Sequence, residues 1–196
     1  PEPAVPELPE VEAVRRQLRR VMEGARIQRV ETRRADLRSP FPSDFAARLE
    51  GQKVKALRRR AKYLLADLES GDTLLMHLGM SGSFRLERGW GAAGREKGRE
   101  KPHSRSRPAT APLDTHDHVV FYMSSGVAVV FNDPRRFGIM ELVPAGQLHR
   151  HPVLSKLGPE PLSREFDGAA LARACRGKKT PLKAALLDQR VVAGLG

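Results

Sequence analysis

A short run near the start of the chain joins prolines and carboxylates to a helix. Residues 6–12 read Pro-Glu-Leu-Pro-Glu-Val-Glu. Pro9 suits the first helical turn, where the N–H that proline lacks needs no partner, and Glu10 and Glu12 stabilise the positive end of the helix dipole. From these residues alone, a capped surface helix is the ordinary interpretation. The alternative is a catalytic group at the head of the helix.

Four cations stand at the entrance to a predicted strand, in the tract Arg58-Arg59-Arg60-Ala61-Lys62-Tyr63. A solvated charge run is the usual explanation of such a tract. The alternative is a functional site, and the tract alone leaves both interpretations open.

Two turns carry side chains that are unusual in such places. Met80 lies in the Gly-flanked run at residues 77–82. Its side chain is either an exposed apolar tip or folded back over the core. The turn at residues 132–138 carries two cations and an aromatic ring, Arg135, Arg136 and Phe137. Proteins that act on a nucleic-acid base lift it from the stack, and apolar wedges with a cation can fill the hole left behind. The second turn is therefore a candidate for intercalation, with Met80 as a possible companion.

Two other groups could bind a metal ion or an anion. His116 and His118 are predicted to lie on one face of a strand, but two ligands without a third argue against a metal, and a phosphate or structural contact is the better interpretation. The run Lys178-Lys179-Thr180 precedes a predicted helix, where backbone N–H groups and lysines together form an anion site.

The composition points to a polyanionic partner. The sequence has 35 Lys and Arg against 23 Asp and Glu, a formal net charge of +12. Nucleic acid is the leading candidate, and a membrane surface or simple solubility is the alternative. Since no apolar run approaches membrane-spanning length and no signal peptide is visible, we expect a soluble intracellular protein. Cys175 is the only cysteine, which excludes an internal disulfide and a cysteine-rich zinc site within these residues.

The hydrophobic pattern predicts an α+β protein in which a helix leads into a β-sandwich. Val11, Val14, Leu18 and Val21 recur at helical spacing. An edge strand is expected within residues 25–34, followed by a short capped helix at 42–49. Further strands, joined as antiparallel hairpins into a sandwich or flattened barrel, are predicted at 54–57, 63–68, 73–78, 83–86, 117–123, 127–131 and 139–143.

Changes in composition divide the chain further. Residues 88–115 are rich in Gly, Pro, Ser, Arg and Lys with few large apolar residues, which predicts a disordered basic insertion. After Pro144 the pattern becomes helical, with candidates at 152–157, 167–175 and a helix capped by Thr180. We therefore expect a sandwich domain over residues 6–143 and the beginning of a helical domain over residues 144–196.

Four separated motifs together resemble the formamidopyrimidine-DNA glycosylases, a family of DNA-repair enzymes. They are residues 6–12, 59–64, 77–82 and 133–138, in the family's order, and Gly158-Pro159-Glu160-Pro161-Leu162 is a further family-like stretch. The resemblance spans nearly all of the chain from Pro6 onward except the insertion. It implies that the helical domain begins a helix-two-turns-helix element. The opening motif resembles the oxidised-purine branch more than the endonuclease VIII-like branch.

The resemblance also implies an activity and its residues. A damaged purine, such as 8-oxoguanine or a formamidopyrimidine, is excised through a proline Schiff base, and elimination then cleaves the strand. The implied catalytic residues are Pro6 as nucleophile, Glu7 as general acid and Lys62 in proton transfer and phosphate binding. The implied DNA contacts are His116, Arg135, Arg136 and Lys178, and the implied void-filling wedge is Met80, Arg135 and Phe137.

The sequence departs from the family at both ends. The family continues past Gly196 into further helices and a zinc finger, so we expect one zinc ion there, no cofactor within this chain, and DNA binding severely weakened by truncation. The family's nucleophile is its first mature residue, whereas the Pro6 nitrogen here is an amide without nucleophilicity. We therefore expect translation to begin at Val5 as methionine, which is then removed.

Two other functions stay open. One is a truncated or divergent relative that binds DNA without catalysis. The other is a basic RNA-binding or ribosome-associated β protein, against which the wedge turn and the Pro-Glu opening argue. The expected partner is damaged double-stranded DNA and not a membrane, and we expect a monomer in the bacterial cytoplasm, associated with the nucleoid.

Overall fold

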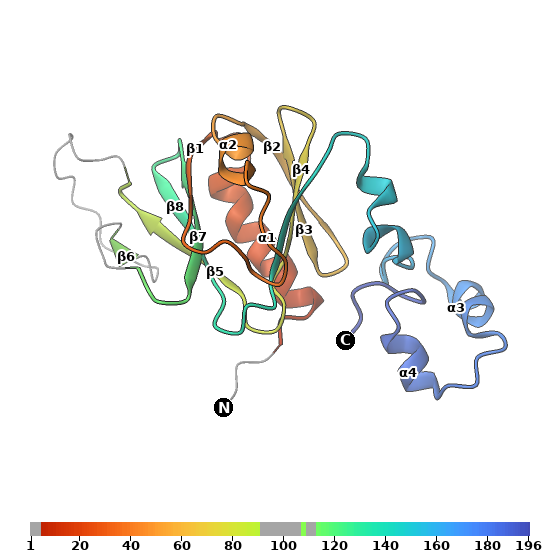
Figure 1. The fold of residues 1–196 in the computed structure, drawn as a ribbon. Helices are drawn as coiled ribbons and strands as arrows, with labels where there is room; N and C mark the ends of the chain where they lie inside the picture. The colour runs from red at the N-terminus through yellow and green to blue at the C-terminus, as the bar shows by residue number, and fades with distance from the viewer. Residues whose placement is uncertain (1–4, 91–106, 109–112) are drawn as a thin grey trace.

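The computed structural model describes residues 5–90, 107–108 and 113–196. Its ribbon shows a leading helix, two β-sheets and a group of short helices at the C-terminal end (Figure 1). This is the α+β architecture that the hydrophobic pattern predicts, and that prediction is confirmed.

The first sheet has five strands in the order β1-β7-β8-β5-β6. In that order, the strands are Ile27–Thr32, Asp117–Met123, Val127–Asn132, Ser83–Arg88 and Arg107–Pro108. The described pairs are antiparallel except β5 with β6. As expected, β1 is an edge strand, and its Val30 lies opposite Phe121 of β7.

The second sheet has four antiparallel strands in the order β2-β3-β4-β9. They are Val54–Arg60, Tyr63–Leu68, Thr73–His77 and Ile139–Val143. The β2–β3 and β3–β4 hairpins agree with the sequence prediction. The hairpin expected between the strands at 73–78 and 83–86 does not form, because β9 already occupies the second edge of β4 and β5 pairs with β8 in the other sheet.

Helix α1, Leu8–Met22, shares one hydrophobic core with both sheets. Val11, Leu18 and Met22 are buried on its inner face. The N-cap of the helix is Glu7, whose backbone N–H donates to Glu10 Oε2 at 3.0 Å. Helix α2, Phe45–Leu49, closes the same core with two buried side chains. Burial against the sheets therefore fixes where the start of α1 lies.

After β9 the chain forms only short helices. They are the 3-10 turns η1 (Leu148–Arg150) and η2 (Leu154–Lys156) and the helices α3 (Gly168–Cys175) and α4 (Leu182–Leu187). The helix expected at 152–157 is thus only the turn η2, which gives way to extended backbone at Leu157, ahead of Gly158 and Pro159. The cap assigned to Thr180 is also wrong, since Pro181 is the N-cap of α4 and no side chain caps it.

The basic insertion predicted at residues 88–115 falls mostly outside the described residues. Arg88 itself ends β5, which pairs with Arg107–Pro108 in parallel.

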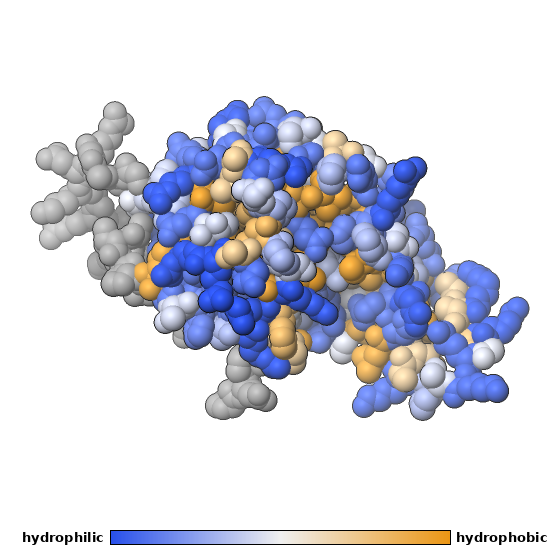
Figure 2. Space-filling view, viewed as in Figure 1, coloured by the Kyte–Doolittle hydropathy of each residue, from blue (hydrophilic) through white to orange (hydrophobic). Residues whose placement is uncertain are grey.

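Hydrophilic side chains cover most of the face seen in the space-filling view (Figure 2). Within the described parts of the chain, no helix is long and apolar enough to cross a membrane.

The fold makes a prediction about its core. Phe121 is fully buried between the sheets, so Phe121→Ala should lower the free energy of unfolding by about 3–5 kcal/mol, through lost burial and the cavity left behind. Leu162→Ala is the control, because Leu162 is 95% exposed and should change stability by less than about 0.5 kcal/mol. Urea unfolding measures both, and a Phe121→Ala loss no larger than that of the control would contradict this packing.

Candidate functional site

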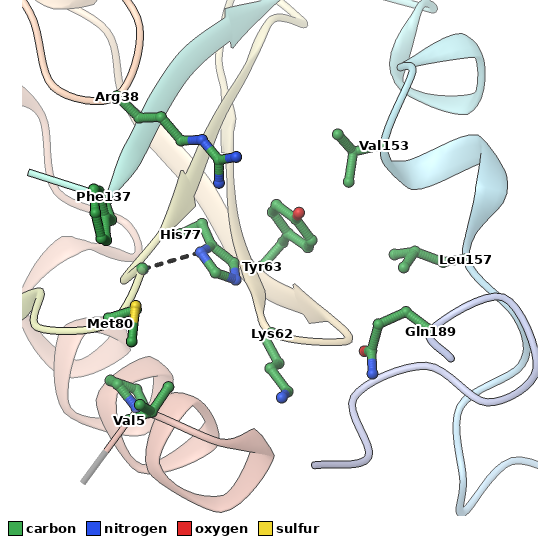
Figure 3. A pocket seen from close by; sticks show the side chains of 12 residues that line it. Val5, Arg38, Lys62, Tyr63, His77, Met80, Phe137, Val153, Leu157 and Gln189 are labelled. Carbon is green, nitrogen blue, oxygen red and sulfur yellow. Dashed lines mark hydrogen bonds between the residues drawn. The ribbon is translucent and has the colours of Figure 1, made fainter. Parts of the chain in front are cut away.

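A cavity of about 640 Å³ lies between the sandwich and the helical segment. Its sandwich side is formed by Lys62, Tyr63, His77, Met80 and Phe137, and its other side by Val153, Leu157 and Gln189 (Figure 3). The remaining lining residues are Val5, Pro6, Arg38 and Gly79. Residues from all four motifs singled out in the sequence therefore meet at one cavity.

Glu7 and Lys62 form an ion pair beside Pro6 at this cavity. Glu7 is the N-cap of α1, and Lys62 follows Ala61 in the tight turn between β2 and β3. Ala61 has a φ of 50°, a left-handed conformation that is uncommon for a residue other than glycine. The start of the helix and the hairpin turn thus bring Pro6 and Glu7 next to Lys62, which lies more than fifty positions later in the sequence.

Glu160 holds the hairpin turn in place. Its carboxylate accepts hydrogen bonds from the Ala61 N–H at 2.5 Å, from Arg59 Nη1 at 2.9 Å and from Arg60 Nη1 at 3.1 Å. Burial would raise the pKa of Glu160, but the Ala61 and arginine hydrogen bonds outweigh it and lower the pKa below its ordinary value. The segment after β9 therefore fixes the backbone immediately before Lys62.

Glu12 ties the same arginines to the first helix. It pairs with Arg15 at 2.8 Å, with Arg16 at 3.0 Å and with Arg59 at 3.2 Å. The Arg15 hydrogen bond is the largest cause that lowers the pKa of Glu12 to about 2, against a smaller opposing effect of burial. Arg59 thus bridges Glu12 and Glu160, so part of the cationic tract is neutralised inside the protein.

His77 presents a neutral imidazole to the cavity. Its Nδ1 accepts the Gly79 N–H at 3.0 Å, which leaves the ring proton on Nε2 (Figure 3). Burial, with smaller contributions from the charges of Lys62 and Arg38, lowers the pKa of His77 to about 4. The site therefore offers a neutral N–H donor next to the Lys62 ammonium.

The structure brings Met80, Arg135 and Phe137 together from two turns. Met80 is 36% exposed and Phe137 43% exposed, and both line the cavity. The Arg135 guanidinium lies 5.1 Å from the centre of the Phe137 ring, within the range of a cation–π contact. The Met80 side chain is thus not folded over the core, and an apolar tip with an adjacent cation stands at the cavity rim.

The other predicted DNA contacts lie on separate segments. His116 is exposed just before β7, and its backbone N–H donates to Asp114 Oδ1 at 2.9 Å. Arg136 is exposed, has a φ of 57° and lies 3.8 Å from Asp36. Lys178 pairs with Asp188 at 3.4 Å. It does not stand at a helix start as expected, because it follows α3 and lies four residues before α4 begins.

Gln189 and the residues after it lie against the start of α1 and the Glu7–Lys62 pair. The Gln189 side chain accepts the Gly194 N–H at 2.7 Å and donates to the Leu195 carbonyl at 2.8 Å. Gly194 packs on Leu8, where a Cβ atom has no room. A Cβ at Gly196 would overlap Glu7 and lie 2.6 Å from Lys62 Nζ. The backbone at Gly196 therefore lies close to the Glu7–Lys62 pair.

Reasoning from the sequence missed several of these residues. Arg38, Tyr63, His77 and Gln189 line the cavity, and Glu160 holds the turn, yet none was assigned a role. His77 and Glu160 lie inside family-like motifs, which was an available signal. Arg38 and Gln189 carried no such signal. Among the described residues, no group of three or more His, Cys, Asp or Glu side chains could hold a metal ion.

Comparisons with known proteins agree with this geometry. Residues 5–140 match the model of the formamidopyrimidine-DNA glycosylase N-terminal domain, and residues 157–196 match that of the formamidopyrimidine-DNA glycosylase H2TH domain. The chain is 62% identical over 192 residues to formamidopyrimidine-DNA glycosylases of Bradyrhizobium sp. strain BTAi1 and Rhodopseudomonas palustris strain HaA2. Each alignment covers 98% of this chain and 63% of the relative, so the chain spans less than two thirds of these proteins.

Solved structures show the same architecture. A complex of Lactococcus lactis Fpg with DNA containing an abasic site matches with a TM-score of 0.79 and 30% identity, over 97% of this chain and 64% of that one. MutM (Fpg) of Thermus thermophilus matches with a TM-score of 0.75 and 36% identity, over 97% and 60%. The fold is the one that these DNA glycosylases share, a β-sandwich followed by a helix-two-turns-helix segment. The chain belongs to the formamidopyrimidine-DNA glycosylase family.

The neutral state of His77 is testable by titration. Its ring resonances should titrate at a pH of about 4 in the free protein, below the ordinary value of 6.5. Because the folded pKa is lower than the unfolded one, this group should reduce stability as pH falls from about 6.5 to about 4. His77→Gln should therefore lose less stability across that window than the unmodified protein. A His77 midpoint near 6.5 in an NMR titration would contradict the burial and charge environment described here.

Proposed function

We propose that the protein is a DNA-repair glycosylase and AP lyase that removes oxidised purines from double-stranded DNA. The observation that carries this proposal is the Glu7–Lys62 ion pair beside Pro6, in a cavity rimmed by Met80 and Phe137. The family membership, the net charge of +12 and the relatives solved with DNA containing an abasic site or Fapy-dG support it. We propose that it acts as a monomer.

Pro6 is the proposed nucleophile. With a free secondary amine, its nitrogen forms a bond to the sugar C1′ while the bond from C1′ to the damaged base breaks, and the proton lost by the nitrogen goes to the departing base. Glu7 gives a proton to the sugar ring oxygen, so the ring opens and leaves an iminium between Pro6 and C1′. The iminium is an electron sink that makes loss of the C2′ proton easier, and elimination then expels the 3′ phosphate. Hydrolysis of the iminium releases the protein.

Lys62 is proposed to bind the neighbouring phosphate and to transfer protons. Its ammonium reaches the Glu7 carboxylate, so a proton can pass between these two groups as the sugar ring opens. The Nε2–H of His77 is a second donor on the same wall of the cavity. Because this imidazole is neutral at physiological pH, it can hydrogen-bond an anion without adding charge beside Lys62.

The chemistry requires that Pro6 be the first residue of the active protein, because an amide nitrogen is not nucleophilic. A protein that begins at Pro6 should form a covalent adduct with abasic-site or 8-oxoguanine duplex in the presence of borohydride, and a matched protein that keeps residues 1–5 should form none. Lys62→Ala should slow trapping by about a hundredfold, the usual scale for a lost proton-transfer group. The exposed Lys55→Ala is the control and should leave trapping unchanged.

The outcomes separate two functions. An adduct that needs the free Pro6 amine supports catalysis. Specific binding of lesion duplex with no adduct, in the protein that begins at Pro6, would overturn the proposed chemistry and favour a DNA-binding protein without catalysis.

The proposed wedge predicts a difference between excision and affinity. Phe137→Ala should slow removal of 8-oxoguanine from duplex by about tenfold or more, since the ring no longer stabilises the unstacked state, while affinity for undamaged duplex falls by less than about threefold. Single-turnover excision and a titration with undamaged DNA measure the two effects. Leu162→Ala, an exposed apolar side chain outside the cavity, should change neither. Equal losses in both measurements would contradict a wedge role.

A further inference from the structure

The two turns that carry the wedge residues run side by side between the sheets. The turn from β4 to β5 carries Met80, and the turn from β8 to β9 carries Arg135 and Phe137. Each turn leaves one sheet and enters the other, since β4 and β9 belong to one sheet and β5 and β8 to the other. The wedge residues thus come from two independent crossings.

A buried carboxylate joins these crossings. Asp133 is fully buried, and its Oδ1 accepts the Ser81 hydroxyl at 2.6 Å while its Oδ2 accepts the Gly138 N–H at 2.8 Å. The Ser81 oxygen in turn accepts the Arg135 N–H at 3.1 Å. Both carboxylate oxygens and the serine hydroxyl are used across the two turns. We call this set of four residues, Ser81, Asp133, Arg135 and Gly138, the Asp133 junction.

The backbone of Asp133 is itself anchored to the start of β7. Its N–H donates to the His116 carbonyl at 3.0 Å, and its carbonyl accepts the Nε2–H of buried His118 at 2.9 Å. The carboxylate therefore projects from a backbone fixed on the five-stranded sheet. It reaches toward the Met80 turn from a rigid base.

Glycines allow the turns to touch directly. A Cβ at Gly79 would lie 2.5 Å from the Phe137 carbonyl carbon and 2.7 Å from the Gly138 nitrogen. A Cβ at Gly138 would lie 2.7 Å from the Phe131 ring and 2.9 Å from Asp133 Oδ2. The two backbones are in contact at the junction, so a displacement of one turn must move the other.

We propose that Asp133 is a positioning residue that makes Met80, Arg135 and Phe137 one rigid wedge. Met80 directly precedes Ser81, Arg135 is itself hydrogen-bonded to Ser81, and Phe137 directly precedes Gly138, so the junction sets the relative height of the three side chains. A wedge held in place before insertion loses little conformational entropy when a base is unstacked. The inference rests on the proposed function, because Asp133 acts only through residues that would enter the duplex.

The first test needs no DNA. Ser81→Ala removes the hydroxyl that links the turns but leaves the Asp133 bond to Gly138. If the junction is one unit, amide exchange in this variant should become faster by about tenfold at Arg135 and also at Gly138, on the scale of about one net hydrogen bond. Ser81→Thr keeps the hydroxyl and should restore both rates. Ser83→Ala is the matched control, because Ser83 is exposed and its hydroxyl bonds to no described residue.

The second test uses 8-oxoguanine duplex with 2-aminopurine next to the lesion. Base unstacking by the wedge should raise the fluorescence with the unmodified protein, with Ser81→Thr and with Ser83→Ala. With Ser81→Ala the rise and the rate of excision should each fall by about tenfold, as expected for a misplaced insertion group. Borohydride trapping on a duplex with a preformed abasic site should change by less than about threefold, because no damaged base has to be unstacked.

The outcomes distinguish this inference from the proposed function. Faster exchange at Arg135 alone, or wild-type excision by Ser81→Ala, overturns the inference. Equal losses on the 8-oxoguanine and abasic-site duplexes would show general structural damage and also overturn it. Absence of excision and trapping in the unmodified protein that begins at Pro6 counts against the proposed function, while the exchange rates still decide whether the junction is one unit.

Discussion

The carboxylate of Glu160 is the interaction on which the arrangement of the site depends. It accepts the Ala61 N–H and two arginines of the β2–β3 hairpin, and Ala61 precedes Lys62 in a left-handed conformation that needs outside support. Glu160 lies in the segment that leads from the sandwich into the helical part of the chain. One half-buried acceptor therefore joins the two halves of the cavity and holds the turn that carries its lysine. A neutral side chain there would leave Arg59 and Arg60 without their shared anion.

Other ion pairs distinguish the arginines near this turn, which pair with Glu12 and Asp67, from Lys62, which pairs with Glu7 at the cavity. Arg15, Arg16 and Arg59 converge on Glu12, and Arg58 pairs with Asp67. Arg58 and Arg59 belong to the cationic tract, and with Arg60 on Glu160 its three arginines are all ion-paired, while a functional role for Lys62 stays a prediction. Lys62 differs because its partner, Glu7, is itself a proposed catalytic group at the cavity. Charge counted along the sequence therefore overstates the number of cations available to bind DNA.

The sequence predicted what depends on local pattern and missed what depends on pairing. Hydrophobic periodicity located the first helix and nearly every described strand, because burial of alternate or helically spaced side chains is written into neighbouring residues. It did not predict the partner of β5, because that partner depends on which sheet edge is free. β9 occupies the edge of β4, and β5 pairs with β8. The sequence pattern failed at Thr180, where the helix begins two residues later. Arg38 and Gln189 could not be found, since only the tertiary fold brings them to the cavity.

The topology explains why the apolar tips stand where they do. The turns that carry Met80 and Phe137 are both sheet-to-sheet crossings, so neither can lie flat against a strand and each projects from the end of the sandwich. The helical segment then supplies the opposite wall through Val153, Leu157 and Gln189 (Figure 3). Gly194 lies against Leu8, and Gly196 lies against Glu7 and Lys62. An apolar rim, the Glu7–Lys62 ion pair and a neutral imidazole are thus held together by strand crossings and by the half-buried carboxylate of Glu160.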